Sequence, residues 1–350
     1  MSVSDQISPE QLQEKKLKPV RYWLYFLAAL VLLMVMVGGA TRLTDSGLSI
    51  TEWKPISGTI PPLSIDDWNA EFEAYKQIPE YQQINKGMSL EEFKGIFWWE
   101  WGHRFLGRVI GFAFLIPFLI FLFQKRLDWK LAPALAILFF MGGFQGFLGW
   151  WMVSSGLSER VDVSQYRLAA HLSAACVLFV SLIWVSRRLR PAQVLWVQKG
   201  WPLLISLLGI VVFIQIAAGA FVAGLDAGFT YNTWPLMDGR FIPQNLALID
   251  PLWLNWFENI TAVQFNHRMI AYLIVALTVG LTWHAWSKTQ FDGVHGWMVI
   301  IAALTLLQVI LGILTLIYVV PMHLALAHQV TAFILVGAIT AYLSDMSRQN

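Results

Sequence analysis

Eight long apolar segments constrain the fold of this chain more than any other feature of the sequence. A helix needs about 20 consecutive apolar residues to cross the hydrocarbon core of a bilayer. Segments of this kind occur near residues 22–40, 102–123, 131–151, 167–186, 201–223, 265–286, 297–317 and 325–344. They are continuous apolar blocks without a period of two, which argues against a membrane β-barrel. The sequence therefore predicts an all-α integral membrane protein with eight transmembrane helices.

The basic residues predict how these helices are oriented. With a cytoplasmic N-terminus, the short segments on that side carry many lysines and arginines, among them Lys15, Lys16, Arg126 and Arg187. The outer loops are longer and hold fewer basic residues per length, and the first of them, 41–100, is acidic. The positive-inside rule then places both termini in the cytoplasm or its organellar equivalent. A formal net charge of +2 is too small to indicate a nucleic-acid partner.

The N-terminal segment and the single cysteine restrict the compartment. The first span could be read as a signal peptide, but an internal span occupies the matching place later in the chain, so we expect it to be retained. The short polar N-terminus lacks the arginine-rich, acid-poor composition of a transit peptide. This favours a bacterial inner membrane, or the mitochondrial inner membrane if the source is eukaryotic. Cys176 lies in the fourth span and is the only cysteine, so no intramolecular disulfide is expected.

An internal repeat divides the chain into residues 1–190 and 191–350. In the first part Gly38 is followed by Asp45 and Trp53, and in the second part glycine, aspartate and tryptophan recur at the same offsets, at positions 219, 226 and 234. The second and sixth spans both open with His-Arg, the third and seventh carry Gln-x-x-Leu-Gly, and the fourth and eighth open with histidine. Four spans return the chain to the side where it started, so the repeat predicts two pseudo-symmetric four-helix bundles in the same orientation.

The two long outer loops are expected to cover the outer face of the bundles. In loop 41–100, Trp68, Phe72 and Tyr75 have helical spacing, which predicts an amphipathic helix over Ser64–Gln77 lying at the membrane surface. Ser89 and Glu92 form a capping-box pattern, and the helix that they start is expected to continue into the second span. Loop 224–262, with several tryptophans and prolines, is the counterpart in the second half.

Four histidines carry the candidate chemistry. His103 and His171 open the second and fourth spans, and His267 and His328 open the sixth and eighth. A single histidine at a membrane rim is more often a solvated residue, but repetition in both halves favours ligation, because polar groups are costly in a membrane. Two imidazoles from separate helices can hold haem iron from both faces, so the sequence predicts one haem site per half. The three other histidines have no counterparts and are interpreted as non-ligands.

One acidic residue distinguishes the two predicted sites. Glu100 lies three residues before His103 and shares its helix face, whereas the matching residue before His267 is Gln264. The difference suggests a reactive first site and a permanent cofactor in the second. The alternative is a rim carboxylate paired with Arg104 or Lys94. The arginines near the histidines are candidates for pairing with haem propionates, although snorkelling to the interface explains any one of them equally well: Arg104, Arg108, Arg167 and Arg268.

These residues resemble the haem A synthase family over nearly the whole chain, from about residue 20 to 344. The resemblance rests on Glu100-Trp-Gly-His103-Arg104 at the head of the second span, on the segment GGATRLTDSGLSITEWKP that begins at Gly38, and on the paired histidines. Within this family, the chain is most similar to the class that has no cysteines in the first outer loop, which includes mitochondrial forms. The lack of cysteine in that loop of this chain excludes a thiol-based redox step there.

The resemblance implies an oxidoreductase that converts a methyl group of haem O to the formyl group of haem A, for cytochrome oxidase assembly. It implies successive hydroxylations of the methyl carbon followed by loss of water. It implies that His267 and His328 hold haem b, that His103 and His171 hold the substrate haem, and that Glu100 is catalytic. A carboxylate there could stabilise positive charge on the reacting carbon or orient a water. Haem O synthase and cytochrome oxidase assembly factors are the partners to expect, in addition to membrane lipid, and the oligomeric state stays open.

Two other classes of function remain open at this point. A bis-His di-haem electron carrier of the cytochrome b type would use the same histidines, but it would leave Glu100 and the two long outer loops unexplained. Such carriers usually place haems near both membrane surfaces, whereas all four histidines here are expected on one side. A haem transport protein could use the Trp98-Trp99 pair for docking, but it should show broken helices and coupling residues near the bilayer midplane.

Overall fold

The structure is a bundle of long helices. The computed structural model describes residues 8–54, 56–158, 160–191, 197, 199–287 and 294–346. Within these ranges eight helices are long and apolar enough to cross a membrane, and there is no β-strand, which confirms the predicted all-α membrane class. These helices are α1 (Pro9–Leu43), α4 (Leu90–Phe123), α5 (Leu131–Val153), α6 (Gln165–Arg188), α7 (Trp201–Gly224), α9 (Ile260–Ser287), α10 (Val294–Ile317) and α11 (Met322–Met346).

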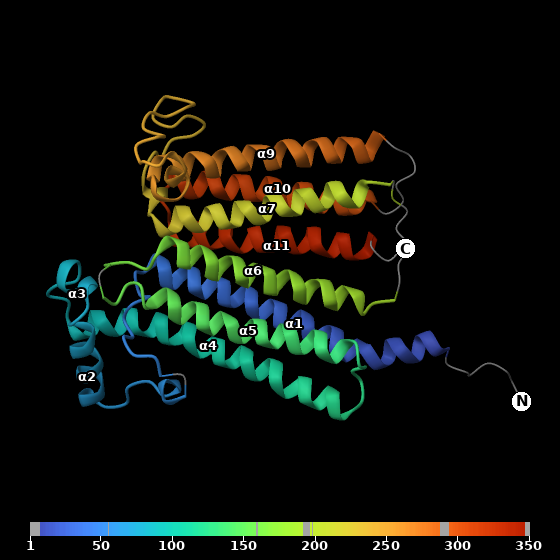
Figure 1. Cartoon of the computed structure of the whole chain (residues 1–350), viewed down its shortest axis with the longest axis horizontal. Helices are drawn as coiled ribbons and strands as arrows, with labels where there is room; N and C mark the ends of the chain where they lie inside the picture. Colours follow the sequence, from blue (N-terminus) through green and yellow to red (C-terminus); the bar gives the residue numbers. More distant parts are fainter. Residues whose placement is uncertain are drawn as a thin grey trace, which may run out of the picture.

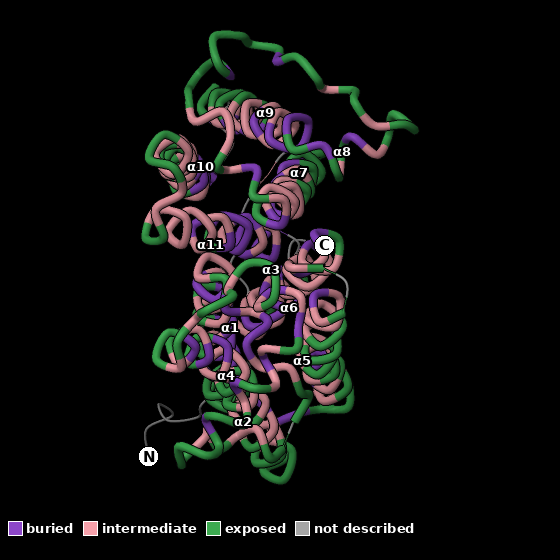
Figure 2. Tube along the Cα trace, turned by 90° about the vertical axis from the view of Figure 1, so that its left-hand side faces the viewer, coloured by how far each residue is buried: buried purple, intermediate pink, exposed green. Residues whose placement is uncertain are grey.

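The eight long helices lie side by side in two sets of four (Figure 1). In the first set α1 contacts α4 and α6, and α5 contacts α4 and α6; in the second set α9 contacts α7 and α10, and α11 contacts α7 and α10. The sets meet where α6 contacts α7 and where α11 contacts α1 and α6. Figure 2 shows the two sets one above the other, with exposed residues on their outward sides. This arrangement is consistent with two four-helix bundles, while the division of the chain at residue 190 stays a prediction.

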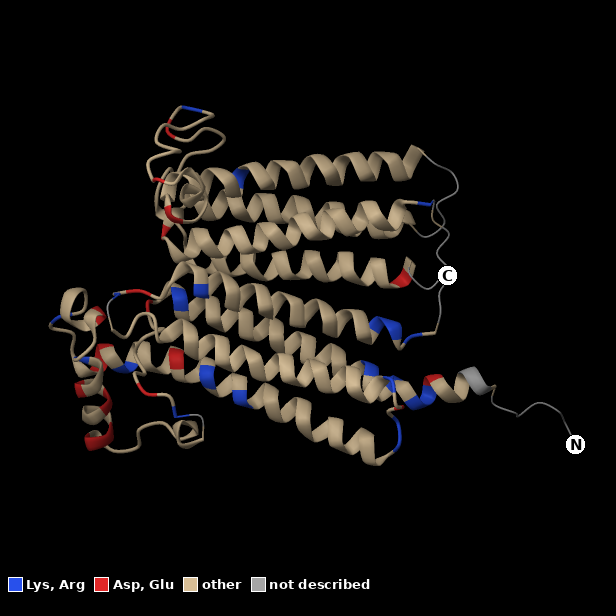
Figure 3. Ribbon diagram, in the orientation of Figure 1, with Lys and Arg blue, Asp and Glu red and all other residues tan. Residues whose placement is uncertain are grey.

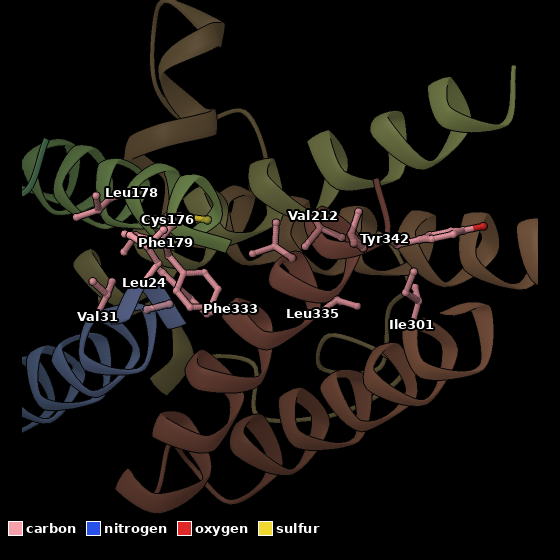
Figure 4. Packing of buried hydrophobic residues seen from close by; sticks show 14 of the residues in the cluster. Leu24, Val31, Cys176, Leu178, Phe179, Val212, Ile301, Phe333, Leu335 and Tyr342 are labelled. Carbon is pink, nitrogen blue, oxygen red and sulfur yellow. The ribbon is translucent and has the colours of Figure 1, made fainter. Parts of the chain in front are cut away.

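One apolar core runs through both sets of helices. Leu24 and Val31 on α1 belong to the same buried cluster as Phe179 on α6 and Phe333 on α11 (Figure 4). The rings of Phe179 and Phe333 lie with their centres 5.7 Å apart, at the contact between the two sets. Cys176 is buried in this cluster, inside the fourth span as expected. The shared core fixes the two sets relative to each other, because buried side chains pack at high density.

Ion pairs join the two sets at both ends of the bundle. At one end Arg42, in the last turn of α1, donates to both carboxylate oxygens of Asp226 beyond α7, at 2.9 and 3.0 Å, and also pairs with Asp45. At the other end Arg187 of α6 pairs with Asp345 of α11, and both side chains are largely buried. Buried charges are costly unless they are paired, so these contacts fix which helix ends meet.

A small domain-like lid covers the end of the first set. The helix α2 (Ile65–Tyr75) lies against the first turns of α4 and runs across the direction of the long helices (Figure 1). The short helix α3 (Pro79–Gln83) contacts α2 through Tyr81. The predicted apolar face of α2 is buried, but Phe93 and Phe97 of α4 cover that face. The amphipathic helix is therefore confirmed, and protein rather than lipid buries its stripe of aromatic residues.

Local sequence signals explain where the lid helices begin. Capping boxes start both α2 and α4. The side chain of Ser64 accepts a hydrogen bond from the backbone N–H of Asp67, and the side chain of Ser89 accepts one from that of Glu92. In both boxes the acidic side chain accepts a hydrogen bond from the backbone N–H of the serine. Each box satisfies N–H groups that a helix start would otherwise leave unpaired. The second box was predicted, and α4 does continue from it as one helix to Phe123.

The second outer loop has little regular structure. It contains α8 (Asn255–Glu258) and the short 3₁₀ turns Ala227–Phe229 and Leu252–Leu254, and a further 3₁₀ turn, Ser57–Thr59, lies in the first loop. Figure 1 shows both loops at the end of the bundle opposite the termini. Basic residues gather near the termini, whereas the acidic residues lie mostly at the loop end (Figure 3). This distribution agrees with the positive-inside pattern, while the cytoplasmic position of the termini stays a prediction.

Candidate functional site

The first pair of predicted ligands lies against glycines of neighbouring helices. His103 on α4 faces Gly38 on α1, where an added Cβ would lie 3.0 Å from the imidazole Nε2. His171 on α6 faces Gly149 on α5, where an added Cβ would lie 3.5 Å from Cε1. Because Gly38 and Gly149 have no side chain, the imidazole rings of His103 and His171 have room between neighbouring helices.

The second pair repeats this arrangement at equivalent positions. His267 on α9 faces Gly219 on α7, with 3.2 Å from an added Cβ to Cε1, and His328 on α11 faces Gly312 on α10, with 2.8 Å. The four glycines belong to the sequence repeat: Gly38 and Gly219 lie near the ends of the first and fifth spans, and Gly149 and Gly312 end the Gln-x-x-Leu-Gly motif. Which glycine contacts which histidine depends on how distant helices pack, so this pairing was not among the sequence predictions.

Two glutamines complete the surroundings of the second pair. The side-chain amide of Gln215 donates to the backbone carbonyl of His267 at 2.9 Å. The ring of His328 has Nδ1 3.2 Å from the backbone carbonyl of Gln308, which favours a tautomer with the proton on Nδ1. Its Nε2 lone pair then faces the side-chain amide nitrogen of Gln308 at 3.4 Å. Both glutamines therefore make interhelical hydrogen bonds to a residue that is a candidate ligand.

The geometry of the second pair fits haem iron. The ring centres of His267 and His328 lie 6.5 Å apart, with the ring planes 74° from parallel. An iron ligated by two imidazoles at about 2 Å, with each nitrogen about 1.1 Å from its ring centre, requires about 6 Å. In the described part of the chain no three His, Cys, Asp or Glu side chains cluster as a metal site. A histidine pair without further ligands suits a metal whose other ligands come from a porphyrin.

Unpartnered polar atoms at both pairs support the same conclusion. Among the described residues, His171 Nδ1 and His267 Nδ1 are buried without a hydrogen-bond partner, as are the side-chain oxygens of Gln145, Gln215 and Gln308. Buried polar groups in native structures are nearly always satisfied by protein, water or ligand. These five atoms therefore mark places where the protein alone does not complete the packing.

Glu100 is buried in the wall beside the first pair, with only 3 % of its surface exposed. One carboxylate oxygen accepts from the Ser49 hydroxyl at 2.8 Å and from the Ile50 N–H at 2.7 Å. The other oxygen accepts from two nitrogens of Arg104, at 2.6 and 3.1 Å. Lys94 pairs with Glu91 instead. Of the two basic residues considered as partners, Arg104 contacts Glu100 and Lys94 does not, and the pair is largely buried against residues 49–52 of the first outer loop.

Gln264 occupies the equivalent place in the second half. Its amide nitrogen donates to the backbone carbonyls of Ala227 and Thr230 at 2.7 and 2.6 Å, and its oxygen accepts from Arg268 at 3.0 Å. Both residues thus tie the preceding outer loop to the helix that carries a candidate ligand. They do so with opposite hydrogen-bond polarity, since the carboxylate accepts from the loop and the amide donates to it.

The four candidate propionate arginines all contact outer-loop or helix-end groups. Arg104 donates to the backbone carbonyls of Ile50 and Glu52 in the first outer loop. Arg268 donates to the backbone carbonyls of Tyr231 and Thr233. These two residues follow Ile50 and Glu52 by 181 positions each and so occupy equivalent places in the second loop. Arg108 donates to the Lys54 carbonyl, and Arg167 to Trp151 and Ser154. Holding the loops is thus a repeated role of the arginine after each histidine. That any of the four also binds a propionate stays a prediction.

The lid contains one strongly perturbed carboxyl group. Glu80 in α3 is 5 % exposed and accepts from the Tyr75 hydroxyl at 3.2 Å. Burial raises the pKa of Glu80 to about 8, and the nearby carboxylates Asp45 and Asp162 raise it further, while the hydrogen bond from Tyr75 opposes them. Sequence reasoning did not select Glu80, because nothing near it in the sequence indicates burial.

The other histidines lie away from the two pairs. His284 near the end of α9 stacks on Trp201, with the ring centres 5.7 Å apart. The ring of His295 in α10 lies 3.2 Å from the Ala285 carbonyl, and His323 is exposed at the start of α11. Their interpretation as non-ligands agrees with this placement.

Comparison with known proteins identifies the family. The family model described as cytochrome oxidase assembly protein, COX15-CtaA, matches residues 21–340. A curated protein from Parvibaculum lavamentivorans named "Heme A synthase" is 46 % identical over 350 residues, covering 99 % of this chain and all of that protein. Proteins with the same name from Chelativorans sp. and Azorhizobium caulinodans are 53 % and 51 % identical, covering 92 % and 95 % of this chain and 90 % and 95 % of their own lengths. The chain belongs to the COX15-CtaA family of cytochrome oxidase assembly proteins.

Proposed function

We propose that this chain is a haem A synthase, an oxidoreductase that converts the methyl group of haem O to the formyl group of haem A for cytochrome oxidase. The observation that carries the proposal is the pair of equivalent histidine sites, each set between helices by repeat-related glycines, with a carboxylate beside only one of them. The full-length similarity to proteins named "Heme A synthase" supports it. We place the protein in a bacterial inner membrane with both termini in the cytoplasm.

The two sites have different roles in this proposal. His267 and His328 would hold haem b, which when bound supplies one-electron chemistry next to the substrate site. His103 and His171 would hold the substrate haem O beneath the lid. Gln215 and Gln308 keep the second pair in a fixed orientation, which limits loss of the permanent group. The placement of all candidate ligands near the loop end of the bundle does not favour an electron carrier that would connect both membrane surfaces.

Glu100 would act on the substrate through a fixed negative charge. Oxidation of a methyl carbon on a porphyrin rim develops positive charge there, and a buried carboxylate can stabilise that charge. Because both oxygens of Glu100 are already held by Arg104, Ser49 and Ile50, its position needs little rearrangement during the reaction. The lid, with Trp68 and Phe97 in its core, would exclude bulk water from the site.

The first test is chromatography of the haems extracted from the purified protein, expressed together with an enzyme that supplies haem O. Haem b together with haem O, its hydroxylated form or haem A is the expected result. Two haem b molecules per chain and no other haem would contradict the proposal and favour the electron carrier. The same assay would show whether haem O synthase or assembly factors co-purify as partners.

A second test separates the chemistry of Glu100 from its contact with the loop. Glu100→Gln removes the charge, and we expect haem A to fall by 10-fold or more while haem b and bound haem O are retained, since losing one electrostatic contact to a transition state costs about 10²-fold. Ser49→Ala removes one hydrogen bond and keeps the charge, and should retain most activity. Equal losses in the two variants would mean that Glu100 only positions the loop.

A further inference from the structure

The end of the bundle that carries the termini has an open hollow lined by basic residues. It lies between the start of α1 and the turn after α4, has a volume of about 620 Å³, and is lined by Leu12, Lys15, Lys16, Gln124 and Arg126. It lies at the opposite end from the histidine pairs, and nothing in the proposed oxidation uses it. We propose that this hollow binds the phosphate headgroup of an anionic phospholipid from the adjoining leaflet.

The position of Arg126 is fixed by the backbone and by two hydrogen bonds. The chain leaves α4 through Lys125, which has a positive φ of 53°, and the N–H groups of Lys125 and Arg126 bond to the carbonyls of Leu122 and Phe121. This is a Schellman turn, which ends a helix in a defined direction. The Arg126 guanidinium then donates to Gln124 Oε1 at 2.7 Å and to the Lys16 carbonyl at 3.0 Å. Both bonds leave positive charge facing the hollow.

The lysines of the hollow have no acidic partner among the described residues. Lys15 and Lys16 are exposed, and the nearest acidic group on α1, Glu14, is directed to Arg21 at 3.9 Å. In the turn after α4, Asp128 accepts from the backbone N–H groups of Lys130 and Leu131 and so caps α5. Among the described residues none of the three basic groups of the hollow forms an ion pair, and a cluster of such groups is the chemistry that recognises a phosphate group.

Apolar side chains beside the hollow favour a lipid over a soluble phosphate. Leu12 lines the hollow and is 61 % exposed, and Phe123 and Trp129 on the α4 and α5 sides are 82 % and 80 % exposed. Exposed aromatic residues at a helix end are typical of the level of lipid headgroups. Figure 3 shows that the start of α1, with its basic residues, extends beyond the ends of the neighbouring helices. A headgroup in the hollow would leave its acyl chains beside Phe123 and α4.

The experiment uses the full chain in neutral detergent. Native mass spectrometry would measure retention of short-chain phosphatidylglycerol, with short-chain phosphatidylcholine and glycerol phosphate as the comparison ligands. We expect phosphatidylglycerol to bind more tightly than either. The double variant Lys15→Gln/Lys16→Gln should weaken its binding about 25-fold, since each basic residue near an anionic surface contributes about fivefold. Glutamine has nearly the helix propensity of lysine, so α1 is retained.

A matched control removes the same charge elsewhere at this end. Arg188→Gln/Lys199→Gln alters two exposed basic residues outside the hollow and should change binding less than twofold. An equal loss in both double variants would show diffuse attraction and overturn the proposal. Binding of glycerol phosphate as tight as that of phosphatidylglycerol would show a site for soluble phosphate, and equal binding of phosphatidylcholine would show a purely apolar contact. Either result would also overturn it.

Discussion

The glycine opposite each candidate ligand offers a graded test of the site. A methyl group added at Gly312 would lie 2.8 Å from His328 Cε1, closer than real Cβ atoms approach, whereas at Gly149 it would lie 3.5 Å from His171 in ordinary contact. Gly312→Ala must therefore move the His328 ring, which the hydrogen bond to the Gln308 carbonyl holds in place. Gly149→Ala needs no movement. The structure predicts loss of haem from the second site and retention at the first.

The expected size of the effect follows from packing energetics. Inserting a methyl group into a close-packed site costs about 1–3 kcal/mol. If this cost falls on the state in which His328 ligates iron, haem affinity at the second site drops by about 5-fold to 150-fold. A helical glycine replaced by alanine also gains about 1 kcal/mol of helix stability, so the fold itself should not be weakened. Loss of haem without loss of helicity is the distinctive result.

The assay is haem content per chain together with the low-spin spectrum of bis-histidine iron. Gly296→Ala on the same helix is the matched control, because an added Cβ there meets nothing within 4 Å. We expect Gly296→Ala and Gly149→Ala to keep the wild-type haem content and spectrum. Unchanged haem content and spectrum in Gly312→Ala would refute the packing argument and the assignment of His328 as a ligand.

Two further predictions concern the lid and the contact between the helix sets. Because the pKa of Glu80 is raised to about 8 by burial, its contribution to stability is present in full below about pH 4.5 and is lost as pH rises through about 8. Proteolysis of loop 41–100 should thus accelerate between about pH 4.5 and 8 in the wild type, level off above that, and stay constant in Glu80→Gln; parallel pH profiles would assign the effect to another group. Asp345→Asn removes the carboxylate that pairs with the buried Arg187 guanidinium and should lower stability by about 3 kcal/mol. Thermal unfolding in detergent would measure this, and an unchanged midpoint would show that the pair contributes nothing.

The sequence predicted the features that depend on neighbours along the chain. All eight spans lie within the helices observed, because length and continuous apolarity are properties of each segment alone. The capping box at Ser89 and the amphipathic helix that contains Trp68 were readable for the same reason. The helices α1 and α4 begin several residues before the predicted spans, because each extends beyond its apolar segment.

Contacts between distant segments could not be read from the sequence. Ser49 and Ile50 bind Glu100 across about 50 residues, and the glycine that faces each histidine lies on another helix. Which helix faces meet is decided by packing across the whole bundle. The repeat was nevertheless an unused signal, since these glycines recur in both halves just as the histidines do.

The duplicated architecture also limits how Glu100 can be interpreted. Both halves use the residue three positions before the first histidine to hold the preceding loop, and both use the following arginine to bind two loop carbonyls. Loop attachment therefore does not by itself require a carboxylate, because Gln264 performs it with an amide. What the first half has in addition is a buried negative charge, balanced by Arg104 and by hydrogen bonds from the loop. Burying a charge is costly compared with burying an amide. The second half also buries a guanidinium group, that of Arg268, but there it donates to the Gln264 amide oxygen. What distinguishes the two copies is therefore the carboxylate, and this is why the first site is the better candidate for the oxidation.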